Sequence, residues 1–426
     1  MPQKLARRAT CVAAVAAVGV WPSQAVQAIP AVAHVPCSAT ALASAMSTAS
    51  SGEMLTLTVG CTYLLTTSLP TVGQDLTIVG NHATVERSTR PPTSAFTILS
   101  VDAGTLTVSN LTFSNGGGAI SATQDGSLSV HGGLFTGNSA VNGGAIYAFS
   151  GTGNLSVTGA KFIKNTAADA GGAIYSSLAA GSTNLTGDTF IMNTAGAVGG
   201  GLYNFYDTDV SNSTFSTNQA ADGGGIFNNA LFTDKLTNVA IRDNTATQDG
   251  GGVATYQTGL KLLNSHITGN HAGNDGGGIY QEGSDGLIGL ALTDTTVEGN
   301  VAQNGGGIYN TADAADVTGS TVSDNQATTD GGGVYNEGSY PAFGNVSLQA
   351  SMVTVNKASV NGGGIYNDGN SGAVAATGSQ VTRNTAAAGG GIYDNLGSST
   401  KLTSSPVQHN KPDNCEPPGS ITGCTG

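Results

Sequence analysis

Apolar and small polar residues alternate along most of this chain, in short segments such as Leu106–Val108 and Leu111–Phe113. A two-residue period is typical of β-strands, whereas an amphipathic helix repeats its apolar positions every three or four residues. No long helical pattern follows residue 52, and the turns between the alternating segments are short. The pattern therefore predicts an all-β chain built from many short strands.

Two motifs recur in step along this pattern. A glycine motif of the type GGGIY occurs eleven times between Gly116 and Asp394, and successive apolar anchors lie 24 to 31 residues apart. An FxxN-like motif alternates with it, and each asparagine precedes the next anchor by 8 or 9 residues. Self-similarity at a period of 20 to 50 residues is the signature of a solenoid, and insertions fall in the variable half of each unit.

Three short strands per repeat, comprising the glycine motif, an LxV-like segment such as Asn154–Val157, and the FxxN motif, account for this period. Neither hairpins nor helical crossovers fit such short turns, so each strand should stack on its counterpart one coil earlier, at about 4.8 Å. We therefore expect one elongated parallel β-helix of about 13 coils. It should be right-handed, resemble the pectin lyase solenoid, and carry a short capping helix at Thr40–Ala49.

Equivalent side chains should form columns in such a coil. Buried asparagines can bond to one another and to backbone groups at the turns. The apolar anchors should form one inward column: Ile120, Ile146, Ile174, Leu202, Ile226, Val253, Ile279, Ile308, Val334, Ile365 and Ile392. The next position is usually aromatic but is Ser121 and Ala254 in two repeats, so it should face outward. This outward column could either stack on itself or contact a glycan or partner protein.

The tetrapeptides GGAI at Gly143–Ile146 and FTGN at Phe135–Asn138 resemble the hallmarks of the polymorphic outer membrane protein repeat family. The combined pattern covers residues 113 to 410 and implies a β-helix. Larger members of that family carry a C-terminal membrane barrel, whereas only 16 residues follow Asn410 here. The chain thus resembles the freely secreted bacterial β-helix repeat proteins that lack the barrel.

Residues 1–28 have the order of a secretion signal: basic residues, an apolar run, and the small-residue site Val26-Gln27-Ala28. No later segment supplies about 20 consecutive apolar residues. We expect an N-terminal cap and first coils at 29–112, repeats at 113–410, and a disulfide-closed tail at 411–426. The remaining cysteines lie at the two ends, and we expect pairs Cys37–Cys61 and Cys415–Cys424 in an oxidising compartment.

Without residues 1–28, 11 basic residues face 27 acidic ones, a net charge near −16. Coulomb repulsion makes nucleic acids and anionic surfaces poor partners. Neutral glycans, cell-surface proteins or cations fit this charge better. A monomer with no membrane insertion is the default expectation.

The richest acidic region lies in the insertions after the glycine motif. If the repeat phases hold, these loops emerge from one face, and such loops often form the binding surface of a solenoid. The candidate binding residues are Glu282, Asp285, Asp313, Asp316, Glu337, Tyr340 and Asp368, with Phe343 beside them. A solvated acidic rim that opposes aggregation is the competing interpretation.

A second acidic column precedes the glycines at Asp222, Asp249 and Asp275. Stacked carboxylates would repel one another unless solvated or bridged, so Ca²⁺ is one interpretation of this column. Ordinary turn residues before glycine are the other. No other cofactor is indicated.

Many parallel β-helices degrade polysaccharides, so catalysis has to be considered. A lyase needs a basic residue beside its carboxylates, yet no Lys, Arg or His occurs between His271 and Lys357. The Gly-His-Gly segment typical of polygalacturonase-like hydrolases is also missing from the sequence. We therefore expect a non-enzymatic, adhesin-like binding protein, with a polysaccharide lyase or glycoside hydrolase using loop carboxylates as the alternative.

Overall fold

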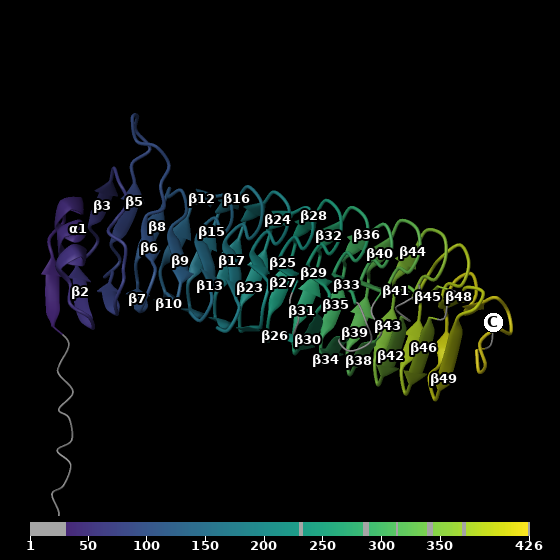
Figure 1. Ribbon diagram of the computed structural model, residues 1–426. Coiled ribbons are helices and arrows are strands. Elements are labelled where there is room, and N and C mark those ends of the chain that lie inside the picture. Colours follow the sequence, from purple (N-terminus) through teal and green to yellow (C-terminus); the bar gives the residue numbers. More distant parts are fainter. Residues whose placement is uncertain are drawn as a thin grey trace, which may run out of the picture. The chain divides into compact units, whose positions relative to one another are not determined.

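The computed structural model describes residues 31–229, 233–283, 289–311, 314–338, 344–368 and 372–424. The predicted secretion signal lies outside these residues, and the predicted domain boundaries stay predictions. Within residues 31–426, every named strand pair is parallel, and each strand pairs with its counterpart in the neighbouring coil (Figure 1). The predicted parallel β-solenoid is confirmed, while its right-handedness stays a prediction.

The glycine motif forms sheet 3, which has 13 strands among the described residues. Its strands are β6 (Leu99–Val101), β9 (Ile120–Gln124), β13 (Ile146–Ser150), β17 (Ile174–Leu178), β21 (Leu202–Asn204), β25 (Ile226–Asn228), β29 (Val253–Tyr256), β33 (Ile279–Glu282), β37 (Ile308–Asn310), β41 (Val334–Asn336), β45 (Ile365–Asn367), β48 (Ile392–Asp394) and β51 (Cys415–Glu416). The predicted inward column is buried throughout; Ile226 is 0% exposed and Ile308 is 1% exposed.

The LxV segments form sheet 1, with 15 described strands. They are β1 (Val32–Val35), β2 (Glu53–Leu57), β4 (Leu76–Val79), β7 (Thr105–Ser109), β10 (Ser127–His131), β14 (Leu155–Thr158), β18 (Thr183–Thr186), β22 (Thr208–Ser211), β26 (Thr233–Thr237), β30 (Gly259–Leu263), β34 (Leu290–Thr293), β38 (Ala315–Thr318), β42 (Asn345–Gln349), β46 (Ala373–Thr377) and β49 (Ser399–Thr403). Most of these strands alternate between buried apolar and more exposed polar residues, as the two-residue period predicts.

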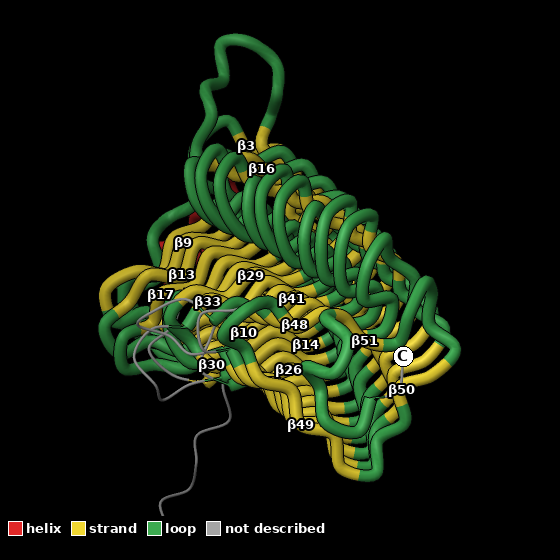
Figure 2. The backbone as a smooth tube through the Cα atoms, turned by 90° about the vertical axis from the view of Figure 1, so that its right-hand side faces the viewer, coloured by secondary structure: helices red, strands yellow, loops and turns green. Residues whose placement is uncertain are grey.

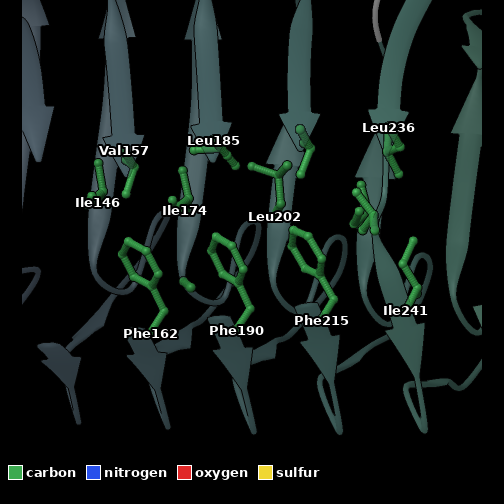
Figure 3. Packing of buried hydrophobic residues seen from close by; sticks show 14 of the residues in the cluster. Ile146, Val157, Phe162, Ile174, Leu185, Phe190, Leu202, Phe215, Leu236 and Ile241 are labelled. Carbon is green, nitrogen blue, oxygen red and sulfur yellow. The ribbon is translucent and has the colours of Figure 1, made fainter. Parts of the chain in front are cut away.

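The FxxN motifs form sheet 2, whose 14 described strands indicate about 14 coils, close to the 13 expected. The strands are β3 (Thr62–Leu65), β5 (Thr84–Arg87), β8 (Thr112–Ser114), β11 (Leu134–Thr136), β15 (Lys161–Ile163), β19 (Thr189–Ile191), β23 (Thr214–Ser216), β27 (Ala240–Arg242), β31 (His266–Thr268), β35 (Thr296–Glu298), β39 (Thr321–Ser323), β43 (Met352–Thr354), β47 (Gln380–Thr382) and β50 (Val407–Gln408). Its phenylalanines point inward towards sheets 1 and 3 and stack from coil to coil (Figure 3), with Phe190 and Phe215 at 4.3 Å between ring centroids.

A fourth strand of two residues follows the asparagine in nine described coils, so the expectation of three strands per coil was incomplete. These strands form sheet 4: β12 (Ser139–Ala140), β16 (Thr166–Ala167), β20 (Thr194–Ala195), β24 (Gln219–Ala220), β28 (Thr245–Ala246), β32 (His271–Ala272), β36 (Val301–Ala302), β40 (Gln326–Ala327) and β44 (Lys357–Ala358). The recurrent alanine is buried in every coil after the first of these. A two-residue strand is too short for its alternation to be recognised in sequence.

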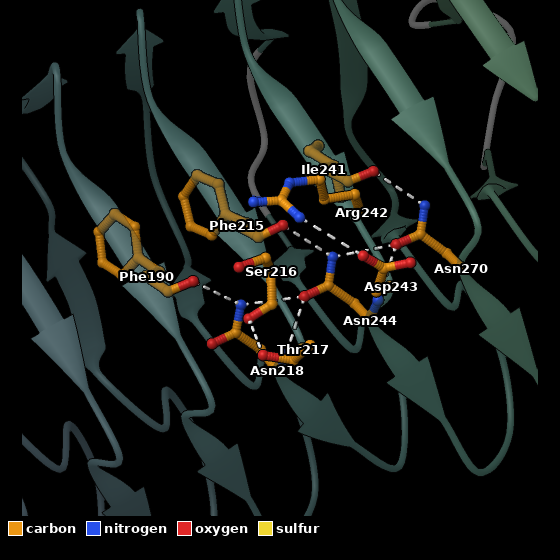
Figure 4. A network of polar contacts seen from close by, with 10 residues as sticks. All are labelled: Phe190, Phe215, Ser216, Thr217, Asn218, Ile241, Arg242, Asp243, Asn244 and Asn270. Carbon is orange, nitrogen blue, oxygen red and sulfur yellow. Dashed lines mark hydrogen bonds and ion pairs between the residues drawn. The ribbon is translucent and has the colours of Figure 1, made fainter.

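The predicted asparagine ladder runs through eleven coils. Each Nδ2 donates to the Oδ1 of the next asparagine at 2.9 to 3.0 Å. In Figure 4, Nδ2 of Asn244 also donates to the Phe215 carbonyl, while Oδ1 of Asn244 accepts from both the backbone N–H and Nδ2 of Asn218. The ladder satisfies polar groups that would otherwise be buried without partners.

The glycines lie in the turn that leads from sheet 4 to sheet 3. Figure 2 shows the turns of successive coils stacked on one another. The first glycine, for example Gly223, has a φ of 60°, a conformation that side chains disfavour. A Cβ atom on the second, Gly224, would lie 2.5 Å from the carbonyl oxygen of Gly251 in the next coil. Both positions therefore require glycine, which explains why the motif recurs.

The two ends agree with the sequence-based expectations. Helix α1 (Ala39–Thr48) matches the predicted capping helix and buries Leu42 and Met46 in the core. Both expected disulfides, Cys37–Cys61 and Cys415–Cys424, are present.

Candidate functional site

The outer side of sheet 3 carries a continuous stack of aromatic rings, here called the aromatic ladder. Neighbouring ring centroids lie 4.7 to 5.8 Å apart. The ladder consists of Tyr147, Tyr175, Tyr203, Phe227, Tyr256, Tyr280, Tyr309, Tyr335, Tyr366 and Tyr393. Self-stacking, one of the two interpretations of this column, is confirmed.

The ladder continues past Ala254, which is one of the two non-aromatic residues at the position after the anchor. Ala254 is fully buried, and Tyr256 fills the gap between Phe227 and Tyr280, with ring centroids at 5.1 and 5.5 Å. Residues two apart on a strand point to the same side, so a ring at either position can join the stack. The sequence contains this signal, but only the structure shows that the second position substitutes for the first.

Stacking changes what the ladder can bind. The rings stack on one another, so between the two ends of the ladder each ring has neighbouring rings against its faces. A sugar ring or aromatic ligand needs a free face for stacking. In the middle of the ladder the aromatic faces are therefore covered, and the hydroxyls of Tyr280 and Tyr309 donate to carboxylates.

The column before the glycines forms a second polar ladder. Asp222 Oδ1 accepts the backbone N–H of Asp249 at 3.0 Å, and Asp249 Oδ1 accepts that of Asp275 at 3.0 Å. Asn304 Nδ2 then donates to Asp275 Oδ1 at 2.9 Å. These bonds are what turn residues would make, and they give the aspartates a structural role.

Calcium binding by this column stays a prediction. Within the part of the chain that the structure describes, no group of three or more His, Cys, Asp or Glu side chains is placed to hold a metal ion.

Three of the predicted loop acids, Glu282, Glu337 and Asp368, lie two residues beyond a ladder tyrosine. The Tyr280 hydroxyl donates to Glu282 Oε2 at 3.3 Å, and the Tyr309 hydroxyl donates to Glu337 Oε2 at 2.8 Å. Asp368 Oδ1 accepts from Asn395 Nδ2 at 2.9 Å. The structure therefore places these three acids along the ladder.

The other predicted binding residues are placed differently or not described. Asp316 is exposed on β38 of sheet 1, between Ala291 and Ser347 of the neighbouring strands. Asp285, Asp313, Tyr340 and Phe343 lie outside the described residues.

Electrostatic interactions connect the two acidic columns with the ladder. Burial raises the pKa of Asp249 to about 6, and the charges of Asp275, Asp222 and Glu282 add to the shift. Burial likewise raises the pKa of Tyr366 to about 12, helped by Asp368 and Asp330. Carboxylates of the pre-glycine column and of the loop acids raise the pKa of the same phenols, so both columns lie near the ladder.

These features form one surface, here called the acidic strip. Sequence analysis treated the pre-glycine aspartates, the aromatic residues and the loop acids as three separate candidates. The strip comprises the ladder from Phe227 to Tyr393 with the carboxylates Asp222, Asp249, Asp275, Asp330, Glu282, Glu337 and Asp368. The recurrent Tyr-x-Glu/Asp spacing is the sequence signal that could have linked the aromatic residues with the loop acids.

Two buried carboxylates in the core were missed. Asp188 and Asp234 are 1% and 0% exposed, and each has one oxygen, Oδ2, without a hydrogen-bond partner. Burial raises the pKa of Asp188 to about 7 and that of Asp234 well above its usual range. Nothing in their local sequence distinguishes them from exposed aspartates.

Comparisons with known proteins agree with the repeat architecture. The family model for the Chlamydia polymorphic membrane protein repeat matches residues 132–148 and 159–177. Each match contains one FxxN and one GGAI motif, so the resemblance inferred from the motifs is confirmed. No curated protein matches the chain.

Among solved structures, tailspike protein 3 of bacteriophage CBA120 is similar at a TM-score of 0.36 and 12% identity. The alignment covers 89% of this chain and 59% of the tailspike chain. No helix among the described residues is long and apolar enough to cross a membrane. By its strand pairing and its repeat motifs, the chain is a parallel β-solenoid with polymorphic membrane protein-type repeats.

Proposed function

We propose that this protein is a secreted, adhesin-like binding protein that contacts its ligand through the acidic strip and does not catalyse a reaction. The supporting observation is the strip itself, in which phenols and carboxylates follow one another from coil to coil on the outer side of sheet 3. At the strand spacing of a sheet, the seven coils from Phe227 to Tyr393 extend for about 30 Å. An extended polymer matches such a length better than a small molecule does.

Neutral glycan chains are the ligand class that this chemistry favours. Sugar hydroxyls donate hydrogen bonds, and the carboxylates and phenol oxygens of the strip accept them. The segment from His271 to Lys357 has no basic residue between its ends, and the whole chain has a formal net charge of −13. Anionic polymers are therefore repelled, while a cell-surface protein with a basic surface is the other partner class to test.

An extracellular location is part of this proposal. Disulfides at both ends of the solenoid favour an oxidising compartment. The predicted secretion signal and the repeat type point in the same direction.

The test is binding of the full chain to a panel of neutral polysaccharides, with and without Ca²⁺, measured by calorimetry. Glu282→Gln together with Glu337→Gln should weaken binding at least tenfold, because two charged acceptors of the strip become neutral amides. Asp316→Asn makes the same kind of change on sheet 1 and serves as the matched control. If no polysaccharide binds, the strip is rejected as a glycan-binding surface. It is also rejected if Asp316→Asn weakens binding as much as the Glu282→Gln and Glu337→Gln pair does.

Glycoside hydrolysis is the second candidate function, and Asp249 is the observation that favours it. Its pKa of about 6 suits a general acid. Glu282 interacts with it electrostatically and is the second carboxylate that glycoside hydrolysis requires. New reducing ends released from a polysaccharide, and lost in Asp249→Asn, would establish this activity. Binding without such products would support the non-catalytic proposal.

A further inference from the structure

The N-terminal end of the aromatic ladder opens into a cavity of about 600 Å³. Tyr147, the first ring, stacks on Tyr175 at 5.1 Å between centroids. In the preceding coil, the position that pairs with Tyr147 is occupied by Ser121, which has no ring. Both Ser121 and Tyr147 line the cavity. The missing rung therefore leaves one face of Tyr147 without a ladder neighbour, and this face is the stacking surface that the middle of the ladder does not offer.

A second ring, outside the cavity lining, lies beside Tyr147. Phe149, two residues further along β13, lies 6.1 Å from Tyr147 between centroids, with its plane inclined by only 11°. Residues two apart on a strand point to the same side, so Tyr147 and Phe149 form a stacked pair on the outer side of β13. Phe149 is 51% exposed, which is unusual for so large an apolar side chain.

The remaining lining of the cavity is uncharged and combines apolar residues, such as Ala140 and Val141, with polar ones. It includes Thr97, Ser139 and Asn142 together with Ser121, and no charged residue takes part. The Thr97 hydroxyl donates to the Gly117 carbonyl at 3.1 Å, so its oxygen is an acceptor for a ligand hydroxyl.

Asn142 supplies the complementary donor. Its Oδ1 accepts the backbone N–H of Ala170 at 3.0 Å, which orients the amide and makes Nδ2 the group that can donate to a ligand.

We propose that this cavity binds a neutral hexopyranose ring, which stacks on Tyr147 and takes the place of the missing rung. The apolar face of a pyranose suits the aromatic surface, and its hydroxyls suit the hydroxyl and amide lining. An aromatic peptide side chain would stack as well but would leave those polar groups without partners. This inference goes beyond the proposed function, because the cavity lies outside the acidic strip and contains none of its carboxylates.

The decisive variant is Ser121→Tyr. It introduces the residue that the next coils have at this position, so the new ring should stack on Tyr147 and fill the cavity without disturbing the coil. Ser156→Tyr, which adds the same side chain to the outer side of sheet 1, is the matched control. Tyr147→Ala removes the stacking surface and gives an independent test if Ser121→Tyr does not fold.

Binding is measured on the full chain by saturation-transfer NMR and by titration. The probes are the methyl glycosides of glucose, galactose and mannose, with galacturonic acid and N-acetyltyrosinamide for comparison. At least one neutral glycoside should bind saturably and in preference to both comparison probes. Its affinity should fall at least tenfold in Ser121→Tyr and in Tyr147→Ala but remain in Ser156→Tyr.

Three outcomes would overturn the proposal: no neutral glycoside binds, a comparison probe binds more tightly, or folded Ser121→Tyr binds as the original chain does. Circular dichroism establishes whether each variant is folded. Failure here is distinguishable from failure of the proposed function, because Ser121→Tyr reports on the cavity, whereas Glu282→Gln reports on polymer binding at the strip.

Discussion

At the residue scale, two columns of buried polar side chains bond to backbone groups at the corners of the coil, where no strand of the neighbouring coil pairs with them. The FxxN asparagine does so between sheets 2 and 4. A hydroxyl column does so between sheets 1 and 2, where Ser265 Oγ accepts the backbone N–H of Val239 at 3.1 Å. Because each side chain bonds to the adjacent coil, removing one affects groups in two coils.

Asn244→Ala should therefore destabilise the fold strongly. It leaves the Phe215 carbonyl without its amide donor and both N–H groups of Asn218 without their acceptor. Buried groups left unpaired cost about 1–3 kcal/mol each, so a loss of about 3 kcal/mol in the free energy of unfolding is expected. Asn184→Ala, at an exposed position of sheet 1, is the control for urea unfolding. Equal midpoints for the two variants would show that the ladder contributes little.

Asp188 should make stability depend on pH. Its pKa is raised by burial from 3.8 to about 7, so between these values the folded chain holds a proton that the unfolded chain releases. This contribution to stability is complete below about pH 4, decreases as the pH rises to about 7, and is absent above it.

Asp188→Ser installs the hydroxyl of Ser213, the residue in the next coil of the same column, and removes the carboxylate. We expect it to stabilise the protein at pH 8 by about 1–3 kcal/mol relative to the original chain, with a smaller difference at pH 4.5. Urea unfolding at both pH values measures this. A difference that does not vary with pH would contradict the assigned role of Asp188.

At the scale of strands, the aromatic ladder shows how one column tolerates a change in register. Ala254 has the anchor-plus-one position, yet the ring comes from Tyr256. The ladder thus needs one ring per coil, supplied from either of two positions on the same side of the strand. On the N-terminal side of Tyr147, the paired residue is Ser121, which has no ring, and a cavity opens there.

Tyr256→Thr should interrupt the ladder between Phe227 and Tyr280. Loss of two stacking contacts and of buried ring area should lower the free energy of unfolding by about 1–3 kcal/mol. Adding Ala254→Tyr returns this coil to the common pattern and should recover most of the loss. Thermal unfolding of both variants checks this; a double variant less stable than Tyr256→Thr would mean that the Ala254 position cannot hold a ring.

At the scale of the whole molecule, the coils stack in one dimension, so the two ends need protection. Helix α1 and the Cys37–Cys61 disulfide close the first coil, and the Cys415–Cys424 disulfide lies in the last. Stability in such proteins is a sum over coils and their neighbours, so an end can open without the middle. An opened end exposes unpaired strand edges.

Replacing Cys37 and Cys61 by serine should loosen the first coils selectively. A disulfide that spans 24 residues stabilises by about 3 kcal/mol. Hydrogen exchange should accelerate in β1 to β5 while β23 to β39 keep their protection, and self-association should increase in gel filtration. Uniform acceleration along the chain would show that the coils unfold as a single unit.

The sequence alone determined the period, the strand type and the columns, because stacking repeats every coil and so leaves the same residue types at the same intervals. Ile226 in the core and Asn244 in its ladder followed from this periodicity, and the cysteine pairs followed from their positions at the two ends of the chain. Only the tertiary structure decided which columns adjoin. Turn geometry and side-chain direction bring Asp249 and Glu282 to the same tyrosines, place Asp316 on another sheet, and open a cavity beside Tyr147. These are contacts between different columns. The repeat period gives the spacing of residues within one column but not the distance from one column to another.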